Sequence, residues 1–314
     1  MPRITVAQLF EDNRERLRLE WIAGRDGGVK QIESANLKDS REGLIGHLNF
    51  IHPNRIQVLA RPEIIHLDAL DPVTRQHTLH RLAASGLACV IVAGGERAPE
   101  HLCALAEVMH AALFSSPLDS VELMWMLRPY LARALADSTT MHGVLLDVLG
   151  VGVMLTGASG VGKSELALEL ISRGSGLVAD DVIELYRVAP ETLEARCPSL
   201  LRDFLEVRGL GVLNIRTIFG EAALRPRKNL KLIVHLEKPA GTEAHYVERL
   251  PLKPGRQEIM GINVSKVTIP VAAGRNLAVL VEAAVRNFVL QLRGIDSTRD
   301  FIERQAQQMN GDER

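Results

Sequence analysis

Eight consecutive residues in the second half of the chain have the types and spacing of a phosphate-binding loop. Gly157 is followed, after four residues, by Gly162, Lys163 and Ser164, which is the P-loop pattern G-x-x-x-x-G-K-[ST]. Glycines let such a loop turn tightly and bring its N–H groups to phosphate oxygens, and the dipole of the following helix favours anions. We therefore expect ATP to be bound by Gly157, Ala158, Ser159, Gly160, Val161, Gly162, Lys163 and Ser164. Lys163 should reach the β- and γ-phosphates, and the Ser164 hydroxyl should bind Mg²⁺.

Two adjacent carboxylates follow an apolar stretch beyond the loop. Asp180 and Asp181 stand 17 and 18 residues after Lys163. Beside a P-loop, such carboxylates can hold Mg²⁺ or accept the proton of a hydroxyl nucleophile. Because neighbouring residues of a strand point to opposite faces, we expect only one of the two to face the γ-phosphate, unless the strand has already ended. The spacing leaves open which one.

A glycine-rich segment, FLEVRGLGVLNIRTIFG (204–220), carries a third group of polar residues. Glu206 and Arg208 flank a turn that Gly209 and Gly211 can make. A carboxylate and a guanidinium in a glycine-hinged loop can combine a metal ligand with a phosphate clamp. The same pair also suits an ordinary salt-bridged surface turn, and both interpretations stay open.

The elements around these residues predict a strand–loop–helix framework. The run MHGVLLDVLGVGVMLTG predicts strands at 143–149 and 151–156, KSELALELISRG predicts a helix, LVADD ends a strand, and 229–238 predicts another strand. Apolar residues recur at i, i+3, i+4 and i+7 over 276–294, which predicts an amphipathic helix, and a polar helix capped by Ser297 follows it. We therefore expect a P-loop kinase-like domain with a mixed sheet that ends in helices.

The first part of the chain has a different pattern. It begins with a helix that Thr5 can cap, continues with strands at 21–24, 55–60 and 87–95, and has helical patterns over 72–86 and 98–116. This alternation predicts a small α/β domain. A helical segment over 117–138 contains Pro129, where we expect a kink or break. It is interpreted as a connector, with a core helix of the first domain as the alternative.

The predicted domains are therefore an amino-terminal α/β domain with its connector helix over 1–136 and a catalytic P-loop domain over 137–314. The whole chain has 314 residues, with 37 Lys and Arg against 38 Asp and Glu and 4% aromatic residues, which argues against binding nucleic acid by bulk charge or stacking. The charged start, the lack of an apolar run of membrane-spanning length and three scattered cysteines predict a soluble cytoplasmic protein.

Four runs resemble the bacterial HPr kinase/phosphorylase family, the HPr serine kinases: GASGVGKSELALELISRG, LVADD, EVRGLGVLNIRTIFG and VTIPVAAGRNLAVLVEAAVRN. The resemblance covers residues 140–294 closely, and IGHLNFIHPNRIQVLARPEI carries a looser likeness in the first domain. It implies a bifunctional enzyme of carbon-metabolism regulation. Such an enzyme phosphorylates a seryl hydroxyl of the phosphocarrier protein HPr with ATP, and removes that phosphate with inorganic phosphate, which releases pyrophosphate. It also implies a homo-oligomer, a hexamer.

The resemblance assigns roles to the residues already singled out. Lys163 and Ser164 match the P-loop lysine and the Mg²⁺-binding serine, and Glu206 matches a second Mg²⁺ ligand. Asp181 matches the aspartate that accepts the serine proton in the kinase direction and donates one in reverse, with Asp180 beside it.

Two further catalytic residues rest on the resemblance alone. His142 matches a family active-site histidine, and Arg249, in YVERL, matches a catalytic arginine. Without the resemblance, a lone histidine at a strand start and an arginine in a charged loop are more often structural. The segment 205–214 matches one tied to both activities, and 270–275 matches one tied to dephosphorylation.

Two other functions stay open as alternatives. A P-loop kinase of a small metabolite would need an arginine-rich lid, and no clear lid is visible in the sequence. A nucleotide-gated sensor without catalysis would bind ATP but transfer no phosphate, and the presence of Asp180 and Asp181 counts against it. The guanine-binding motif N-K-x-D and the motif L-S-G-G-Q of ABC ATPases are absent from the sequence.

Overall fold

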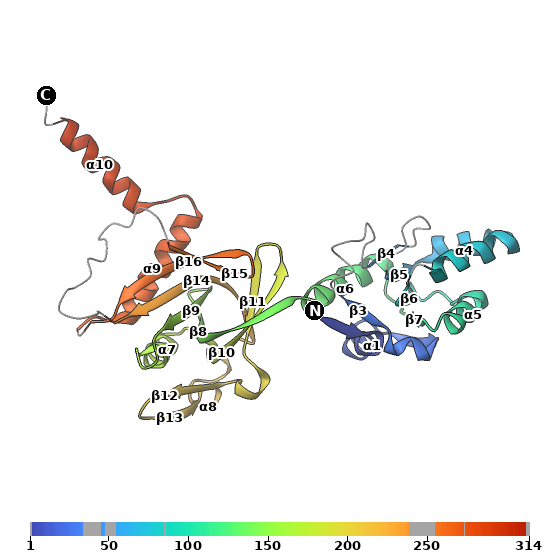
Figure 1. The fold of residues 1–314 in the computed structure, drawn as a ribbon, viewed down its shortest axis with the longest axis horizontal. Coiled ribbons are helices and arrows are strands. Elements are labelled where there is room, and N and C mark those ends of the chain that lie inside the picture. Colours follow the sequence, from blue (N-terminus) through green and yellow to red (C-terminus); the bar gives the residue numbers. More distant parts are fainter. Residues whose placement is uncertain are drawn as a thin grey trace. The chain divides into compact units, whose positions relative to one another are not determined.

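The chain folds into two compact units, Met1–Asp137 (unit 1) and Ser138–Arg314 (unit 2). The structure, a computed structural model, describes residues 2–33, 45–47, 55–84, 86–238, 255–272 and 274–311 (Figure 1). Each unit has its own sheets and its own buried apolar clusters, so each has its own core. Among the described residues, no helix is long and apolar enough to cross a membrane.

Unit 1 is built on a sheet with the strand order β2-β7-β6-β5-β4. The parallel strands are β4 (Ile45–His47), β5 (Ile56–Leu59), β6 (Cys89–Val92) and β7 (Ala112–Ser115). At the edge, β2 (Glu20–Ala23) pairs with β7 in the antiparallel direction, and β1 (Arg3–Thr5) and β3 (Gln31–Glu33) form a separate antiparallel pair. The central strands β5 and β6 are buried along their whole length, as expected for parallel strands covered on both faces.

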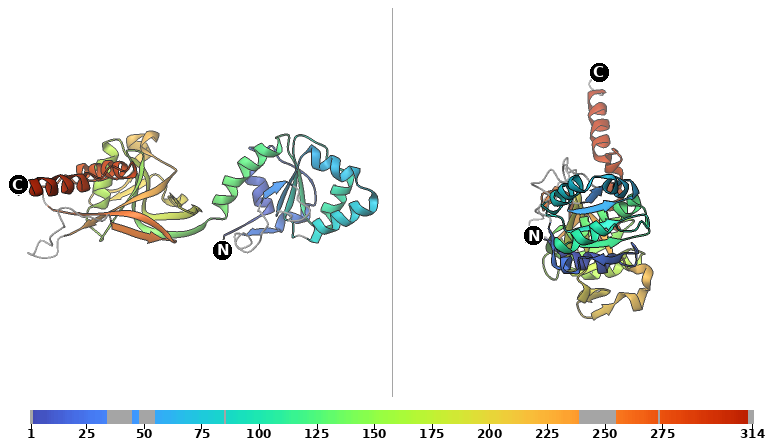
Figure 2. Two further views of the ribbon diagram at one scale, coloured as in Figure 1. Left: turned by 90° about the horizontal axis from the view of Figure 1, so that it is seen from above. Right: turned by 90° about the vertical axis from the view of Figure 1, so that its right-hand side faces the viewer.

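Helices cover both faces of this sheet, as Figure 2 shows. One face packs on α1 (Val6–Asn13) and α6 (Ser120–Ala134), and the other packs on α3 (Arg61–Ala69), α4 (Pro72–Ala84) and α5 (Glu100–Val108). A short 3₁₀ helix spans Arg25–Val29. The predicted helix start is confirmed, because the Thr5 hydroxyl accepts a hydrogen bond of 3.1 Å from the amide of Gln8.

Within the segment 117–138, the helix α6 spans Ser120–Ala134 and continues through Pro129 instead of breaking there. Proline removes the hydrogen bond to the carbonyl four residues earlier, which here belongs to the exposed Trp125, where water can replace the lost donor. Leu123, Leu127 and Leu131 are buried in the core of unit 1. The helix is therefore a core helix, the alternative to the connector interpretation.

The helix predicted within 98–116 is too long at its carboxyl end. The helix α5 ends at Val108, and the chain enters the strand β7 at Ala112. This apolar run is buried between β2 and β6, so tertiary pairing overrides the local helical pattern.

Unit 2 contains a sheet with the strand order β11-β10-β8-β9-β14-β16-β15. The sheet is mixed, which confirms the predicted fold class. Its strands are β8 (Asp137–Val148), β9 (Val151–Gly157), β10 (Gly176–Ala189), β11 (Thr192–Arg196), β14 (Arg227–Glu237), β15 (Gly255–Ile259) and β16 (Ile262–Pro270). The strand β14 runs parallel to both β9 and β16, whereas β8 runs antiparallel to β9. Because β11 also pairs with β14, the sheet closes on itself between these two strands.

The two faces of this sheet are covered differently. One face packs on α7 (Lys163–Ser172) and α9 (Leu277–Leu292) in a large apolar cluster, and the other forms a cluster made mainly by the strands themselves. The last helix is α10 (Ser297–Gly311). Its cap is Asp296, which accepts hydrogen bonds from the amides of Thr298 and Arg299, so the prediction that Ser297 is the cap is wrong by one residue.

A hairpin that the sequence pattern did not predict lies beside α7. It consists of β12 (Phe204–Val207) and β13 (Gly211–Asn214) and is followed by α8 (Ile215–Phe219). Short 3₁₀ helices at Ser199–Leu201 and Glu221–Ala223 flank this segment. Leu205 and Val207 are buried in the same cluster as α7, so the hairpin is anchored to the core of unit 2.

The strand β9 provides a test of this core. Leu155 is fully buried, and we expect Leu155→Ala to lower the free energy of unfolding of unit 2 by about 2–5 kcal/mol through the cavity it leaves. The control is Leu200→Ala, because Leu200 is 87% exposed and its loss should change stability by less than about 0.5 kcal/mol. Denaturant unfolding of the full chain, followed by circular dichroism, measures both. Equal midpoints for the two variants would contradict the assignment of Leu155 to the core.

Candidate active site

The predicted phosphate loop connects β9 to α7. The strand ends at Gly157 and the helix begins at Lys163, as the sequence predicts. A Cβ atom on Gly157 would lie 2.4 Å from the carbonyl oxygen of Leu236 in β14, so only glycine permits the strands to approach this closely. Gly162, at the start of the helix, has a left-handed φ of 100° that side chains rarely adopt.

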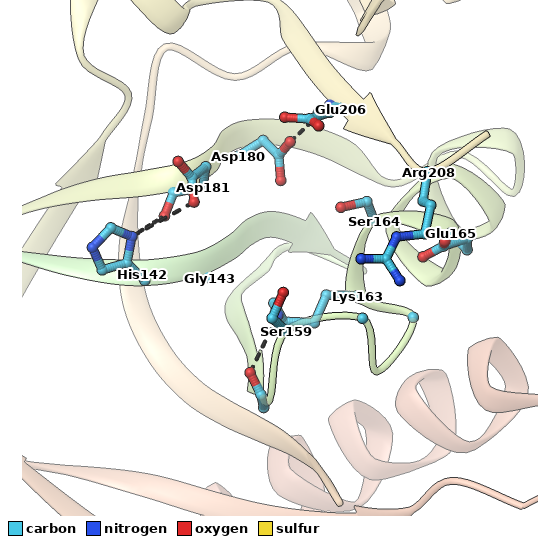
Figure 3. Close-up of a pocket in the computed structure, with 13 residues that line it drawn as sticks. His142, Gly143, Ser159, Lys163, Ser164, Glu165, Asp180, Asp181, Glu206 and Arg208 are labelled. Atoms are coloured by element: carbon cyan, nitrogen blue, oxygen red, sulfur yellow. Dashed lines mark hydrogen bonds and ion pairs between the residues drawn. The ribbon is translucent and has the colours of Figure 1, made fainter. Parts of the chain in front are cut away.

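A cavity of about 420 Å³ opens beside this loop (Figure 3). It is bordered by the loop and α7, by β8 and β10, and by the hairpin of β12 and β13. Its lining residues are His142, Gly143, Gly157, Ser159, Gly160, Gly162, Lys163, Ser164, Glu165, Asp180, Asp181, Glu206 and Arg208. The fold therefore brings together groups that stand up to 66 positions apart in the sequence, between His142 and Arg208.

The ammonium group of Lys163 lies over the start of the loop. Its Nζ donates hydrogen bonds to the carbonyl oxygens of Gly157 and Ala158, each at 3.2 Å. Ser164 follows in the first turn of α7, where the helix dipole is positive. This end of the cavity therefore presents a cation, a hydroxyl and the amino end of a helix, which together suit a chain of phosphates.

Asp180 and Asp181 both line the cavity, so the strand does not separate them onto opposite sides of it, and which of them faces the γ-phosphate stays a prediction. The strand β10 does not end at these residues but continues to Ala189. Asp181, however, has a left-handed φ of 62°, which breaks the alternation of a regular strand. The distortion at this one residue lets two consecutive carboxylates reach the same cavity.

The carboxylate of Asp180 is buried and holds the hairpin. Its Oδ2 accepts a hydrogen bond of 2.8 Å from the backbone amide of Glu206. Burial raises the pKa of Asp180 above its ordinary value, and the neighbouring carboxylates of Asp181 and Glu206 raise it further, whereas the amide hydrogen bonds act in the opposite direction. Asp180 is therefore a carboxylate with a fixed partner in a strongly acidic neighbourhood.

Asp181 is instead paired with His142 and open to solvent. The imidazole Nδ1 lies 3.5 Å from Oδ1 of Asp181 and 3.2 Å from its backbone carbonyl oxygen. A proton on Nδ1 can be donated to the backbone carbonyl oxygen, which places the imidazole beside the carboxylate. The side chains of His142 and Asp181 are 83% and 75% exposed, which makes this the accessible side of the cavity.

The oxygen donors of the cavity fit Mg²⁺ bound together with a nucleotide. In the part of the chain that the structure describes, no cluster of three or more His, Cys, Asp or Glu side chains is arranged to hold a metal ion by itself. Mg²⁺ usually takes only one or two protein carboxylates and completes its shell with water and substrate phosphates. Ser164 in the first turn of α7 and Glu206 in the hairpin supply hard oxygen atoms to the same cavity, so the predicted pair fits this mode of binding.

Some predicted residues lie elsewhere. Arg249 falls in 239–254, outside the described residues. Val161 is buried in the core cluster with α7, so its side chain anchors the loop instead of facing a ligand. The side chains of 270–275, of which 273 is not described, do not line the cavity, whereas Glu206 and Arg208 of the segment 205–214 do.

Two residues that line the cavity, Gly143 and Glu165, were not predicted as site residues. Glu165 follows the P-loop serine directly, so a closer look at the first turn of the predicted helix would have found it. Gly143 has no such signal. A Cβ atom there would lie 2.5 Å from the carbonyl oxygen of Leu155, so its importance comes from the pairing of β8 with β9.

The chain is similar to known proteins over nearly its whole length. The family description "HPr Serine kinase N terminus" matches residues 4–131, and "HPr Serine kinase C-terminal domain" matches residues 133–305. An HPr kinase/phosphorylase of Nitrosomonas europaea is 58% identical over 313 residues, which cover 99% of this chain and 96% of the relative. One from Chromobacterium violaceum is 55% identical over 304 residues, covering 97% and 95%.

A solved structure is also similar. It is described as the HPr(Ser) kinase/phosphatase from Coxiella burnetii and is 38% identical, with a TM-score of 0.46. The match covers 52% of this chain and 98% of the solved one.

The bond between Asp180 and the amide of Glu206 predicts how firmly the hairpin is held. Asp180→Ala removes the acceptor, and a hydrogen bond to a carboxylate contributes about 1–3 kcal/mol, so amide exchange over 204–214 should accelerate about tenfold or more. Asp180→Asn is the matched control, because the amide oxygen can still accept. Hydrogen exchange read by mass spectrometry compares the variants. Unchanged protection in Asp180→Ala would show that the hairpin is held by its apolar contacts alone.

Proposed function

Because the chain belongs to the HPr serine kinase family, we propose that unit 2 transfers the γ-phosphoryl group of ATP to a serine of the phosphocarrier protein HPr, and that the same cavity removes it with inorganic phosphate. The names of the curated relatives support both activities. Family membership over both units disfavours the alternatives of a metabolite kinase and of a sensor without catalysis.

One observation carries the proposal at the level of residues. A glycine-rich loop with Lys163 and Ser164 shares a single cavity with Asp181 and His142, which come from different strands. The first pair suits phosphate binding, and the second suits proton transfer to and from a hydroxyl. When bound beside Ser164 and Glu206, Mg²⁺ would neutralise charge on the phosphates.

In the kinase direction, Lys163 and the N–H groups of the loop hold the phosphates in place. The serine hydroxyl enters from the exposed side and gives its proton to the Asp181 carboxylate, beside which the His142 imidazole lies. The new bond joins the serine oxygen to the γ-phosphorus, while the bond from this phosphorus to the β,γ-bridging oxygen breaks, so ADP leaves. Asp180 is less suited to be the base, because it is buried and its Oδ2 holds the amide of Glu206, whereas Asp181 is open to an entering hydroxyl.

In the reverse direction, the same groups exchange roles. An oxygen of inorganic phosphate, held by Lys163 and the loop, attacks the phosphorus of phosphoserine, and pyrophosphate forms. The bond to the serine oxygen breaks, and protonated Asp181 returns its proton to this oxygen. Since the two reactions share one transferred phosphoryl group, a single site can serve both.

Three further proposals rest mainly on the resemblance. Arg249 would be a catalytic arginine, and the protein would act as a homo-oligomer, a hexamer. Its place of action would be the cytoplasm, which the free thiols of Cys89, Cys103 and Cys197 support. Light scattering of the purified protein measures the oligomeric state.

The activity is tested with labelled ATP, Mg²⁺ and purified HPr, followed by inorganic phosphate. Label should first enter HPr on serine and should then leave as pyrophosphate. Label that remains on ATP, or that leaves HPr only as free phosphate, would contradict the proposal. The same assay with a panel of small hydroxyl metabolites tests the alternative acceptor.

Asp181→Asn tests the proton acceptor. We expect both rates to fall by about 10²–10⁴-fold, because a positioned general base contributes about that factor, while ATP affinity stays near that of the unchanged protein. Asp26→Asn in unit 1, an exposed carboxylate outside the cavity, is the control and should leave the rates unchanged. A normal phosphorylation rate in Asp181→Asn would assign the proton to another group.

A further inference from the structure

One histidine close to the phosphate loop has no role in the mechanism above. His235 lies near the end of β14, and Nδ1 of its imidazole is 3.0 Å from Oγ1 of Thr156 in β9. The two strands are parallel neighbours in the sheet (Figure 1), and Thr156 stands directly opposite His235. Thr156 is the last residue before Gly157, the first glycine of the loop. The imidazole is therefore bonded to the strand end from which the loop starts.

This pair lies on the face of the sheet away from α7 and α9. Leu155 and Leu236 are buried in the apolar cluster with these two helices. Because alternate residues of a strand point to opposite faces, their neighbours Thr156 and His235 point away from the helices. On that other face Met154 is fully buried, whereas Thr156 and His235 are half-buried. The pair therefore stands at the rim, where the apolar cluster of this face ends.

The hydroxyl of Thr156 is the polar group of an otherwise apolar strand. The strand β9 has the sequence VGVMLTG, and Thr156 is its one polar side chain. Burying a hydroxyl or an imidazole costs free energy unless it finds a hydrogen-bond partner, and here each group is the partner of the other. A hydroxyl can donate to an unprotonated Nδ1 and accept from a protonated one, so the bond can persist in both forms of the histidine. Such a bond suits a fixed support.

The bond belongs to a series of contacts that ends at the phosphate-binding lysine. On the helix face, the side chain of Val161 anchors the loop in the core cluster. On the opposite face, the bond from Thr156 to His235 holds the strand end. The carbonyl oxygen of the next residue, Gly157, accepts a hydrogen bond of 3.2 Å from Nζ of Lys163. The position of this strand end therefore helps to determine where the loop and the ammonium group lie.

We propose that His235 is a positioning residue for the phosphate loop, which acts through Thr156 on Gly157 and on the loop that follows. For the use of ATP, the inference rests on the proposed function. The two groups of the proposed proton transfer, Asp181 and His142, belong to the other strands β10 and β8. Binding of phosphates therefore depends on His235 more than the chemical step does.

Loss of either partner should weaken phosphate binding. In Thr156→Val, which keeps the shape of the side chain, and in His235→Ala, we expect the Kd for ADP and the KM for ATP to rise about three- to tenfold, since one hydrogen bond is lost. The kcat should change by less than about twofold, as when an interaction common to ground state and transition state is removed. The double variant should bind ADP no more weakly than the weaker single variant, because the two groups act through each other. Calorimetry gives the Kd, and the labelled HPr assay gives KM and kcat.

Two further variants separate the hydrogen bond from the packing around it. In His235→Asn, the side-chain amide can place a polar atom near the position of Nδ1, so this variant should recover most of the ADP affinity that His235→Ala loses. Thr268→Val is the matched control, because Thr268 is the exposed threonine opposite His235 on its other neighbour, β16. Within the described strands, no side-chain hydrogen bond joins Thr268 to His235, so ADP affinity should stay unchanged.

Thermal unfolding of each variant identifies a purely structural role. If Thr156→Val and His235→Ala melted earlier but bound ADP normally, the pair would only stabilise the fold, and the proposal would be wrong. Additive losses in the double variant, or a His235→Asn variant as weak as His235→Ala, would equally overturn it. If the unchanged protein bound ADP but did not phosphorylate HPr, the proposed function would fail. The ADP measurements would still test His235, because they need no acceptor.

Discussion

The close packing of the phosphate loop against β14 is the constraint on which the rest of unit 2 depends. Gly157 lies so near the carbonyl of Leu236 that no side chain fits between them, and this contact fixes where β9 ends and α7 begins. From there, the pairing of β8 with β9 brings His142 to the mouth of the cavity. The closure of the sheet through β11 and β14 fixes the remaining strands, including β10 with its two aspartates.

Charge is the second organising element. Four carboxylates line the cavity, those of Glu165, Asp180, Asp181 and Glu206, against the permanent cations of Lys163 and Arg208. Such an excess of carboxylates repels a polyphosphate unless a cation enters with it, which supports the proposal that nucleotide and Mg²⁺ bind together. Burial raises the pKa of Asp180, and the neighbouring carboxylates of Asp181 and Glu206 raise it further. The near-neutral net charge of the whole chain is therefore compatible with clusters of negative and positive side chains in this cavity.

Local sequence patterns predicted the parts of the site that local interactions determine. The phosphate loop, α7 and the strand before it depend on glycine spacing and short-range periodicity, and the structure has them where predicted. The left-handed backbone at Asp181 depends on its tertiary surroundings, and no residue next to it in the sequence predicts this conformation. The hairpin is likewise held by a long-range bond, from Glu206 to Asp180, so its place over the loop could not be derived from spacing. His142 was predicted from family resemblance alone. Its position in the site depends on a contact with Asp181, which lies 39 residues further along the chain, and spacing cannot predict such a contact.

The two sides of the cavity differ in a way that suits a protein acceptor. The loop side is anchored, because the Val161 side chain is buried in the core cluster with α7 and Gly157 packs closely against β14. The acceptor side is open, since the described residues leave most of His142 and Asp181 in contact with solvent. Sites for small molecules usually enclose most of their ligand, so an acceptor metabolite would meet few contacts here. When a folded protein carries the serine, the protein surface around that serine can cover His142 and Asp181 and exclude water from them. The openness that would weaken a metabolite kinase would thus allow a protein-sized substrate to reach Asp181, the proposed base.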